Sequence, residues 1–472
     1  MLIRTKIIAT IGPASGHLEM LRKLADAGVD VFRINFSHGN QQQWDELLGN
    51  VRTVEAETGE PLAVMADLCG PKMRVGKISG GPVLLDEGGQ IRIQQDPIIG
   101  DAQRISTTMG NLIEAFGVGD SLLLDDGKIH LEVTDVEKPG QLVCKVIRGG
   151  LLEGHKGINV PGVNLGISAL TEDDRRHVQW MASKDFDYLA LSFVQSADDV
   201  SRLRDLLDEI GCHPDIIAKI EKPQALVNIS EIIDVSDGIM VARGDLGVEM
   251  DLPRVPVAQK RIAGLCRQRA VPCIIATQML ESMTHSAVPT RAEVSDVGNA
   301  VLDHADAVML SGETAVGQFP VEAVRMMDRV VQEVQAYHDE TDSACEMSNT
   351  IEQETTAALG SAVRAVLKEE DIAAVAVFTA TGTTARLLAK MRLSRPILAM
   401  SGSLSAVRKM CLYYGVQPTR ADAPKHTRDV LTLASKLVLE RHMAQRGDKI
   451  VVLSGRPIGQ PGATNTLVVH TV

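Results

Sequence analysis

Eight short apolar runs recur along the chain, and each ends in polar residues or glycine. They span residues 5–13, 29–37, 61–68, 187–193, 215–221, 238–245, 271–278 and 307–314. Amphipathic stretches that suit helices separate most of them, for example 18–28 and 197–211. Near-continuous apolar strands of this kind are typical of a parallel sheet that is covered on both faces. The pattern therefore predicts an α/β fold.

Two α/β architectures fit such a pattern, a (β/α)8 TIM barrel and a doubly wound open sheet. The count of eight runs favours the barrel. The ends of the runs favour the barrel too, because each run ends in residues that can take part in catalysis. A doubly wound sheet would concentrate them at one switch point.

The connection between Leu68 and Asp187 is too long for an ordinary loop between a strand and a helix. It holds short alternating segments with glycine, proline and aspartate between them, and hairpin signals at 125–128 and 137–140. We therefore predict an inserted all-β domain over residues 71–166. An insertion at the carboxyl end of a barrel strand lies over the active site, so a lid is more plausible than a decoration.

After a helix that starts at Pro320, the polar stretch 338–349 is expected to be a linker. Helix and strand patterns then resume at 352–368, 373–379, 383–391, 396–400 and 449–455. We expect three domains: a barrel catalytic domain, a lid and a C-terminal α/β effector domain. Their predicted bounds are 1–70 with 167–338, 71–166, and 345–472.

Composition and charge exclude several classes of function. The 472 residues carry a net charge of −13, which argues against nucleic acid or an anionic membrane as partner. Seven scattered cysteines without CxxC spacing indicate reduced thiols, not a disulfide framework or a zinc site. The chain shows no signal-peptide pattern and no apolar run long enough to span a membrane. A cytoplasmic protein is expected.

Charged and polar residues share faces at the ends of the predicted strands. Side chains alternate along a strand, so residues two apart point the same way. Three such sets follow: Lys219 with Glu221, Arg243 with Asp245, and Arg33 with Asn35 and Ser37. Buried salt bridges inside the barrel are one explanation, since an unpaired buried charge costs several kcal/mol. Clustering at one end of many barrel strands favours an active site instead.

Glu221 and Asp245 form a pair of hard oxygen donors on neighbouring strands. With so few protein ligands, the natural occupant is Mg²⁺ or Mn²⁺, completed by water and substrate oxygens. Lys219 beside such a cation suits the stabilisation of a transferring phosphoryl group or an enolate.

Further side chains can serve the same cavity. Arg33 and Arg74 can make bidentate contacts to a phosphate. Thr277 and Ser311 lie on the next two predicted strands and can relay a proton directly or through water.

Eight long segments carry a family resemblance. They are RTKIIATIGPAS, FRINFSHG, KGINVPG, IIAKIE, MVARGDLGVE, ATQMLESM, PTRAEVSDVGNAVLDHADAVMLSGETA and LSGRPIGQPGATN. From residue 4 to the C-terminus, the chain resembles the pyruvate kinase family. The resemblance implies a cytoplasmic glycolytic enzyme that transfers the phosphoryl group of phosphoenolpyruvate to ADP, giving pyruvate and ATP. It also implies a barrel with a β lid after the third strand, a C-terminal effector domain and a homotetramer.

The resemblance assigns roles in phosphoryl transfer. Glu221 and Asp245 would hold the divalent metal. Lys219 would stabilise the charge on the transferring phosphoryl group and the enolate oxygen, and Arg33 would bind the substrate phosphate.

The resemblance also assigns binding and protonation roles. The backbone at Gly244–Asp245 and Thr277 would hold the substrate carboxylate, and Thr277 with Ser311 would help deliver the proton. The nucleotide and its metal would be approached by Asn35, His38, Arg74 and, from the lid, Lys156. For His38, a hydrogen bond that only shapes its loop is an equal alternative.

The chain departs from the potassium-dependent members of the family after its third strand. Their segment Asp-Thr-Lys-Gly-Pro-Glu is here Asp-Leu-Cys-Gly-Pro-Lys. Asn35, Ser37 and Asp67 of the monovalent-ion site remain, whereas Leu68 lacks a hydroxyl and Lys72 replaces an acid. A lysine ammonium can supply the charge that K⁺ would provide. We expect activity without K⁺; a surface Lys72 without a role is the alternative.

A threonine-rich turn in the C-terminal domain suits a phosphate. Thr379, Thr381, Thr383 and Thr384 surround Gly382 at a strand-to-helix junction, where backbone N–H groups are free. Ordinary helix capping by threonine is the alternative. The resemblance favours a phosphorylated sugar or nucleotide effector, with 454–464 as a covering loop.

Two other functions stay open at this point. Another phosphoenolpyruvate- or pyruvate-handling barrel, such as a carbon–carbon lyase, would share the metal carboxylates but would not need the lid with Lys156. A catalytically dead metabolite sensor is disfavoured, because Lys219, Glu221, Asp245 and Thr277 are all present.

Overall fold

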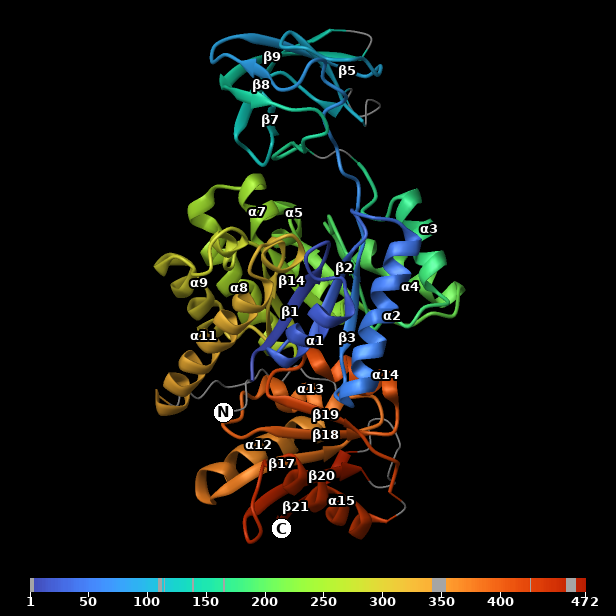
Figure 1. Cartoon of the computed structure of the whole chain (residues 1–472), viewed down its shortest axis with the longest axis vertical. Helices are drawn as coiled ribbons and strands as arrows, with labels where there is room; N and C mark the ends of the chain where they lie inside the picture. The colour runs from blue at the N-terminus through green and yellow to red at the C-terminus, as the bar shows by residue number, and fades with distance from the viewer. Residues whose placement is uncertain are drawn as a thin grey trace.

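The computed structural model describes residues 4–108, 113, 115–137, 140–163, 166–341, 354–424, 426–455 and 464–472. Three units follow one another along the long axis, with the β-rich lid at one end, a barrel in the middle and the C-terminal sheet at the other end (Figure 1). The predicted fold class, a TIM barrel with a β lid and a C-terminal α/β unit, is confirmed.

Eight parallel strands close into the central barrel. In spatial order they are β1 (Lys6–Ile11), β16 (Ala307–Leu310), β15 (Cys273–Ala276), β14 (Gly238–Ala242), β13 (Asp215–Ile220), β12 (Tyr188–Leu191), β3 (Ala63–Asp67) and β2 (Val31–Asn35). The first strand pairs with the last, with Lys6 opposite Ala307, so the ring has no free edge. The open-sheet alternative is therefore wrong.

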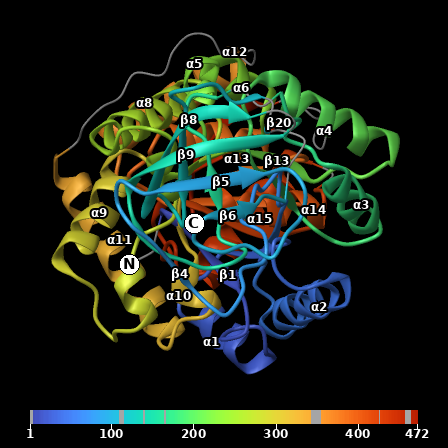
Figure 2. The ribbon, with the colours of Figure 1, turned by 90° about the horizontal axis from the view of Figure 1, so that it is seen from above.

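Helices surround this ring on all sides (Figure 2). The longer ones are α1 (Leu18–Asp26), α2 (Gln41–Thr58), α3 (Glu172–Met181), α4 (Ala197–Glu209), α6 (Ile229–Val235), α8 (Val255–Gln268), α9 (Arg291–Leu302) and α11 (Pro320–Thr341). Short helices α5 (Pro223–Val227), α7 (Arg243–Glu249) and α10 (Gly312–Ala315) follow three of the strands. Helix α11 extends into the stretch predicted as a linker, and residues 342–349 of that stretch lie outside the described residues.

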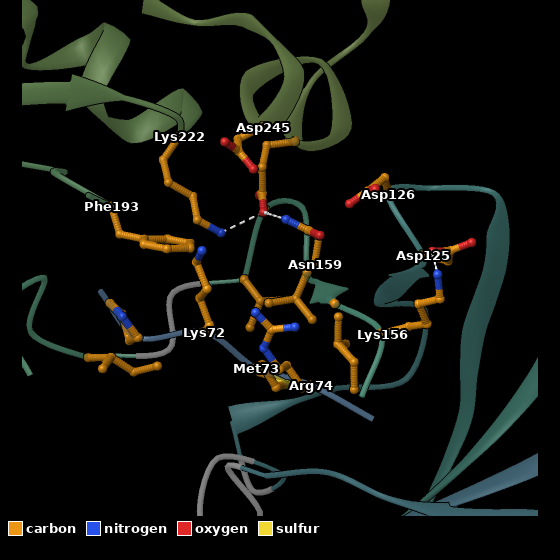
Figure 3. Close-up of a pocket in the computed structure, with 18 of the residues that line it drawn as sticks. Lys72, Met73, Arg74, Asp125, Asp126, Lys156, Asn159, Phe193, Lys222 and Asp245 are labelled. Atoms are coloured by element: carbon orange, nitrogen blue, oxygen red, sulfur yellow. Dashed lines mark hydrogen bonds and ion pairs between the residues drawn. The ribbon is translucent and has the colours of Figure 1, made fainter. Parts of the chain in front are cut away.

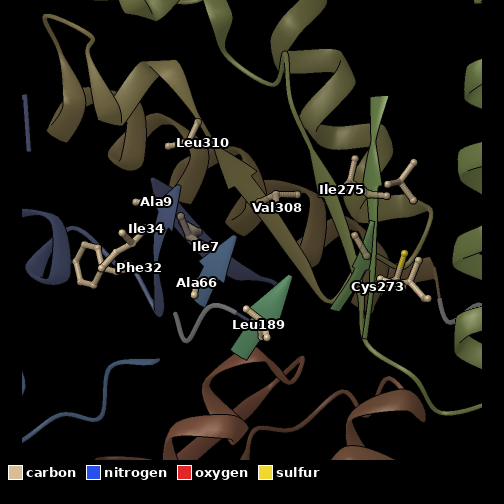
Figure 4. Packing of buried hydrophobic residues seen from close by; sticks show 14 of the residues in the cluster. Ile7, Ala9, Phe32, Ile34, Ala66, Leu189, Cys273, Ile275, Val308 and Leu310 are labelled. Carbon is tan, nitrogen blue, oxygen red and sulfur yellow. The ribbon is translucent and has the colours of Figure 1, made fainter. Parts of the chain in front are cut away.

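Alternation along the strands divides the barrel core into two layers. Ile7, Ile34 and Ile275 belong to the layer between strands and helices (Figure 4). Ile8 and Ile217 belong to the layer that fills the ring itself. Side chains two and four positions after an inward-pointing residue also point inward. The functional side chains at the strand ends therefore point into the mouth of the barrel.

The lid has a sheet and a core of its own. Its six-stranded sheet has the order β11 (Ile158–Asn159), β7 (Ser121–Leu124), β8 (Ile129–Glu137), β9 (Gln141–Arg148), β5 (Gln90–Gln94) and β6 (Arg104–Ser106). A separate pair joins β4 (Val83–Leu85) to β10 (Gly150–Leu152). The predicted hairpin turn at 125–128 joins β7 to β8. The one at 137–140 joins β8 to β9, although its residues 138 and 139 are outside the described residues.

The C-terminal unit is a five-stranded sheet flanked by helices. The strand order is β19 (Val416–Arg420), β18 (Ile397–Ser401), β17 (Ile372–Phe378), β20 (Lys449–Gly455) and β21 (Thr464–Thr471). The helices are α12 (Glu354–Glu369), α13 (Thr383–Lys390), α14 (Leu404–Lys409) and α15 (Thr427–Glu440). Sequence reasoning located α12, β17, α13, β18 and β20 and missed β19, β21, α14 and α15.

Among the described residues, none of the helices combines the length and the apolar character that a membrane crossing needs.

Candidate active site

The ammonium group of Lys219 is the centre of the site. It lies 2.9 Å from Glu221 Oε1 and 3.2 Å from Asp67 Oδ1, and it donates a 2.7 Å hydrogen bond to Ser192 Oγ. Burial by itself would lower the pKa of Lys219, but the Asp67 and Glu221 carboxylates outweigh it and raise the pKa above its usual value. The side chain is therefore charged at every physiological pH.

Inside the strand, Lys219 occupies the position that alternation predicts. Ile217 points into the ring, so Lys219 and then Glu221 follow on the same face. The Lys219–Glu221 ion pair considered as an alternative to an active site is present. The two interpretations do not exclude each other, because the pair lies at the mouth of the barrel.

Arg33 and Asp67 form a buried pair beside Lys219. Arg33 Nε lies 2.6 Å from Asp67 Oδ2, and its Nη1 donates to Thr10 Oγ1 at 2.9 Å. Burial would raise the Asp67 pKa, but Lys219 and Arg33 outweigh it and hold this pKa below its usual value. One ionised carboxylate thus orients two cations, a role that sequence reasoning did not give to Asp67.

Asp245 lies in the first turn of α7, not on a strand, because β14 ends at Ala242. The prediction that Arg243 and Asp245 share a strand face is therefore wrong. Arg243 Nη1 pairs with Asp296 at 2.7 Å, and its Nη2 donates to the Thr277 carbonyl at 2.8 Å. Arg243 thus supports the loop after β15, while Asp245 lines the cleft between lid and barrel.

Asp245 and Glu221 are close enough to influence each other's charge. Asp245 opens onto the cleft, but the cleft walls withdraw much of the solvent around it. Together with the Glu221 charge, this burial raises the Asp245 pKa to about 6. Glu221 itself is buried and accepts a 2.8 Å hydrogen bond from the Phe193 amide. Two repelling carboxylates at a cleft fit a divalent cation, which would relieve the repulsion.

Thr277 and Gly244 come together as predicted. Thr277 Oγ1 accepts a 2.7 Å hydrogen bond from the Gly244 amide and donates to the Ala276 carbonyl at 2.6 Å. Thr277 has a φ of +68°, and Gln278 follows at +53°. A left-handed conformation in a β-branched residue costs about 1–3 kcal/mol, so this turn is held in place by its surroundings.

Ser311 directly follows β16, and its amide donates to Glu313 Oε2 at 2.7 Å. Its Oγ is buried and has no hydrogen-bond partner among the described residues. Ser311 also lines a cavity of about 730 Å³ together with Arg33, Asn35 and His38. Sequence patterns did not indicate this cavity, whose other walls come from the segment between β1 and α1 and from α2 and α10.

The cleft between lid and barrel has a volume of about 300 Å³ and is lined by Lys72, Arg74, Lys156 and Asp245 (Figure 3). Arg74 Nη1 donates to the His155 carbonyl at 3.0 Å, and Lys156 Nζ lies 3.1 Å from Asp125 Oδ1. The structure thus brings the predicted lid lysine opposite the barrel carboxylate.

The contacts of His38 support the alternative in which it shapes its own loop. Its carbonyl accepts a 2.7 Å hydrogen bond from the Trp44 indole. Burial, followed by the charges of Lys72, Arg74 and Arg33, lowers the pKa of the His38 ring below its usual value. The ring is therefore neutral at pH 7 and can either accept or donate a hydrogen bond.

Lys72 reaches the predicted monovalent-ion site. Its Nζ donates a 2.9 Å hydrogen bond to Ser37 Oγ, and the Ser37 amide donates to Asn35 Oδ1 at 3.1 Å. Leu68 is buried. The ammonium group of this exposed lysine therefore lies beside Ser37, one of the residues of that predicted site.

In the threonine-rich turn, the hydroxyl groups mostly bind one another and the turn itself. Thr379 Oγ1 accepts from the Gly382 amide at 3.1 Å, and Thr381 and Thr383 hydroxyls lie 2.9 Å apart. Thr384 Oγ1 lies 2.7 Å from Thr464 Oγ1. Gly382, with a φ of +86°, precedes α13 without a side-chain cap, so threonine capping does not account for this turn. Residues 456–463 of the expected covering loop lie outside the described residues.

Comparisons with known proteins extend these observations. Residues 2–324 match the family model described as pyruvate kinase, barrel domain, and residues 357–470 match the one described as pyruvate kinase, alpha/beta domain. The chain is 39% identical over 471 residues to pyruvate kinase of Geobacillus stearothermophilus, covering 99% of this chain and 80% of that protein. It is 40% identical over 464 residues to pyruvate kinase of Methylorubrum extorquens, covering 98% and 96%. The solved structure of a pyruvate kinase from Cryptosporidium parvum superposes with a TM-score of 0.91 at 33% identity, covering 99% and 96%.

Proposed function

Because this chain belongs to the pyruvate kinase family and is a phosphotransferase, we propose that Lys219 and its neighbours transfer the phosphoryl group of phosphoenolpyruvate to ADP. The observation that carries the proposal is the convergence of two fixed cations and two carboxylates at the mouth of the barrel. Lys219 and Arg33 both pair with Asp67, buried Glu221 pairs with Lys219, and Asp245 lines the adjoining cleft.

Arg33 and Lys219 bind and orient the substrate in this proposal. Asp67 holds both cations in place, so little reorganisation is needed when the P–O bond to the enolate oxygen breaks and a bond to the terminal ADP oxygen forms. The Lys219 ammonium stays charged and stabilises the enolate oxygen. The Glu221–Asp245 pair would hold Mg²⁺ (or Mn²⁺), which neutralises charge on the phosphoryl and enolate oxygens when bound.

Protonation of the enolate carbon completes the reaction. The Thr277 hydroxyl hydrogen is committed to the Ala276 carbonyl, whereas the Ser311 hydroxyl has no partner among the described residues. We therefore place Ser311, with water, on the proton path, and assign to Thr277 the positioning of the turn at Gly244, which would hold the substrate carboxylate.

The nucleotide would occupy the two cavities that flank the site. Arg74 and Lys156 supply positive charge in the cleft, and Lys156 can exchange Asp125 for a phosphate. Asn35 and His38 lie at the second cavity, where Trp44 and Leu47 offer an apolar wall for a base.

Activity without K⁺ is the next part of the proposal. The hydrogen bond from Lys72 to Ser37 supports it, since it brings a permanent positive charge to the monovalent-ion site. Exchanging K⁺ for tetramethylammonium at constant ionic strength should leave the rate unchanged. A several-fold loss of rate would contradict this proposal.

Regulation and assembly are proposed from the resemblance. The turn at Thr379, Thr381, Gly382, Thr383 and Thr384 would bind a phosphorylated sugar or nucleotide, and the chain would form a cytoplasmic homotetramer. The domain bounds proposed above, 1–70 with 167–338, 71–166 and 345–472, accompany this assignment. Titration with sugar phosphates and AMP tests the effector, and sedimentation velocity tests the tetramer.

A lactate-dehydrogenase-coupled assay with phosphoenolpyruvate, ADP and Mg²⁺ tests the core of the proposal. The wild-type chain should turn over, and Lys219→Met should abolish turnover while Mn²⁺ binding at Glu221 and Asp245 persists. No turnover in the wild type would favour a metabolite sensor or a lyase. Unchanged turnover in Lys219→Met would refute the role of this lysine.

A further inference from the structure

Glu249 ends helix α7, one turn beyond Asp245. Its side chain is only 2% exposed, and its Oε1 lies 2.6 Å from Lys222 Nζ and 3.0 Å from Asn159 Nδ2. Lys222 and Asn159, both labelled in Figure 3, donate to the same Glu249 oxygen. Asn159 belongs to lid strand β11, so a buried barrel carboxylate holds the lid by a direct hydrogen bond.

Both barrel members of this cluster adjoin the carboxylates assigned to the metal. Lys222 directly follows Glu221 in the chain, and Glu249 is four residues beyond Asp245, which puts the two on one face of α7. Lys222 Nζ also lies 5.7 Å from the ring centre of Phe193, whose amide donates to Glu221. A series of contacts therefore leads from the lid to Glu221, and helix α7 links Glu249 to Asp245.

The two partners of Glu249 differ in charge, and this difference suits a contact that opens and closes. Lys222 neutralises the buried carboxylate from within the barrel, so Glu249 keeps a cation when the lid departs. The Asn159 amide is neutral and can leave without stranding a charge. The lid also comes near the barrel at Gly127, where an added Cβ would lie 3.7 Å from Cγ1 of Val248.

We propose that Glu249 is a positioning residue that couples closure of the lid, through Asn159, to the placement of Glu221 and Asp245. The proposal rests on the metal role given to these two carboxylates above. When Asn159 binds Glu249, the lid is fixed over the cleft, and α7 and the segment after β13 are held in one arrangement.

Charge exchange between Asn159 and Glu249 tests the coupling. Asn159→Asp sets a second carboxylate against Glu249, and kcat/KM for ADP should fall at least tenfold, more than in Asn159→Ala. In the double variant with Glu249→Gln, the new carboxylate at position 159 can accept a hydrogen bond from the glutamine amide. Adding Asn159→Asp to Glu249→Gln should therefore lower kcat/KM for ADP less than threefold. An undiminished effect in the double variant would overturn the proposal.

Hydrogen–deuterium exchange reports lid closure without turnover. With Mg²⁺ and phosphoenolpyruvate, residues 125–128 and 158–159 should become protected in the wild type, and Asn159→Asp should exchange there at least threefold faster. Equal protection in both would overturn the proposal. Glu137→Gln removes an exposed lid carboxylate that lies 3.5 Å from Arg92, and it should change neither readout. A wild type that shows this protection but no turnover would refute the proposed function and leave the coupling supported.

Discussion

At the residue scale, Asp67 determines how the site is charged. It is fully buried, it pairs with both Arg33 and Lys219, and these cations keep it ionised. Lys219 also lies 2.9 Å from Glu221, so the two cations are balanced by two carboxylates, Asp67 and Glu221. The charge of a phosphorylated substrate would then be offset by the divalent metal and by the lysine and arginine side chains of the cleft, in a protein whose net charge is −13.

Replacing Asp67 by asparagine should therefore impair both stability and turnover. The two cations would lose their buried counter-charge, which costs about 3–5 kcal/mol and lowers the urea midpoint. We also expect kcat to fall by about two orders of magnitude, because Lys219 and Arg33 lose their fixed geometry. Asp45→Asn, at an exposed carboxylate 2.7 Å from Lys184, is the matched control and should change neither value. Wild-type kcat in Asp67→Asn would contradict this account.

Lys72→Glu should convert the enzyme into one that K⁺ activates. The change removes the ammonium group bonded to Ser37 and places a carboxylate there, so a monovalent cation is needed to restore the charge. The measurement compares rates in potassium and tetramethylammonium chloride, and we expect a ratio of about ten or more for the variant. Lys77→Glu makes the same charge change at an exposed lid position and should keep a ratio near one.

Strand alternation accounts for which site residues could be predicted. It placed Lys219, Glu221 and Arg33 correctly, because β13 and β2 are regular up to the mouth of the barrel. The same rule could have found Ser192, two residues beyond the inward-facing Ala190. It failed for Asp245, which lies beyond the end of its strand. Alternation did not single out Glu249, one of whose two partners comes from the lid.

At the element scale, short helices α7 and α10 replace the ends of two predicted strands. Arg243–Glu249 and Gly312–Ala315 turn the chain sharply after β14 and β16. The apolar runs continue to these points without a break, so periodicity could not mark where each strand stops. The consequence is favourable for the site, since a short helix aims both Asp245 and Glu249 at the cleft.

An ion pair between Lys390, the last residue of α13, and Asp306 joins this helix to the barrel. Both side chains are about 1% exposed. Lys390→Met should lower the free energy of unfolding by about 3–5 kcal/mol, because buried Asp306 would lose its nearest cation and keep the Cys273 amide at 2.7 Å and Arg392 at 3.3 Å. Urea titration measures this loss. Lys436→Met, at an exposed position of α15 and 3.7 Å from Glu440, should change the free energy of unfolding by no more than about 0.5 kcal/mol. A loss below about 1 kcal/mol at Lys390 would show that the pair does not stabilise this junction.

At the scale of the whole molecule, a network of charges joins the C-terminal unit to the lower end of the barrel. Arg408 Nε donates to Glu55 Oε1 at 2.8 Å, and Arg52 Nη2 donates to Asp187 Oδ2 at 2.7 Å. Tyr188 donates to the Lys409 carbonyl. These groups lie far apart in sequence, so no local pattern could have predicted their contacts.

The pH dependence of stability should reflect the raised pKa of Asp187. Burial, only partly offset by Arg52, raises the Asp187 pKa to about 6. Its stabilising effect is complete below about pH 3.8 and is lost as the pH rises through 6, because the folded state binds the proton more tightly. The difference between the folded-state pKa of about 6 and the usual value of 3.8 corresponds to about 3 kcal/mol in the free energy of unfolding.

Asp187→Asn removes this titration. The stability of the variant relative to wild type should therefore rise by about 2.5 kcal/mol between pH 4 and pH 7, as measured from paired urea midpoints. Asp198→Asn, at an exposed pair on α4, should give a constant difference. A flat profile for Asp187→Asn would contradict the raised pKa.

The order of the three units could be predicted from sequence, because the long insertion and the renewed strand pattern are changes in chain composition. Their internal detail could not. Strand β19 contains Pro418, which argues against a strand, and β21 alternates too weakly to stand out. The 730 Å³ cavity likewise arises from helices that are separate in sequence.

The closed ring also sets an order of events during synthesis. Strand β1 cannot pair on one side until β16 exists, roughly 300 residues later in the chain. At about 5–20 residues per second, that is a wait of roughly 15–60 s on the ribosome. All strands of the lid leave the ribosome long before then, and the lid has its own core. The nascent chain thus carries a folded lid above a barrel that is still open, and the last barrel strand, β16, closes the barrel beneath the lid.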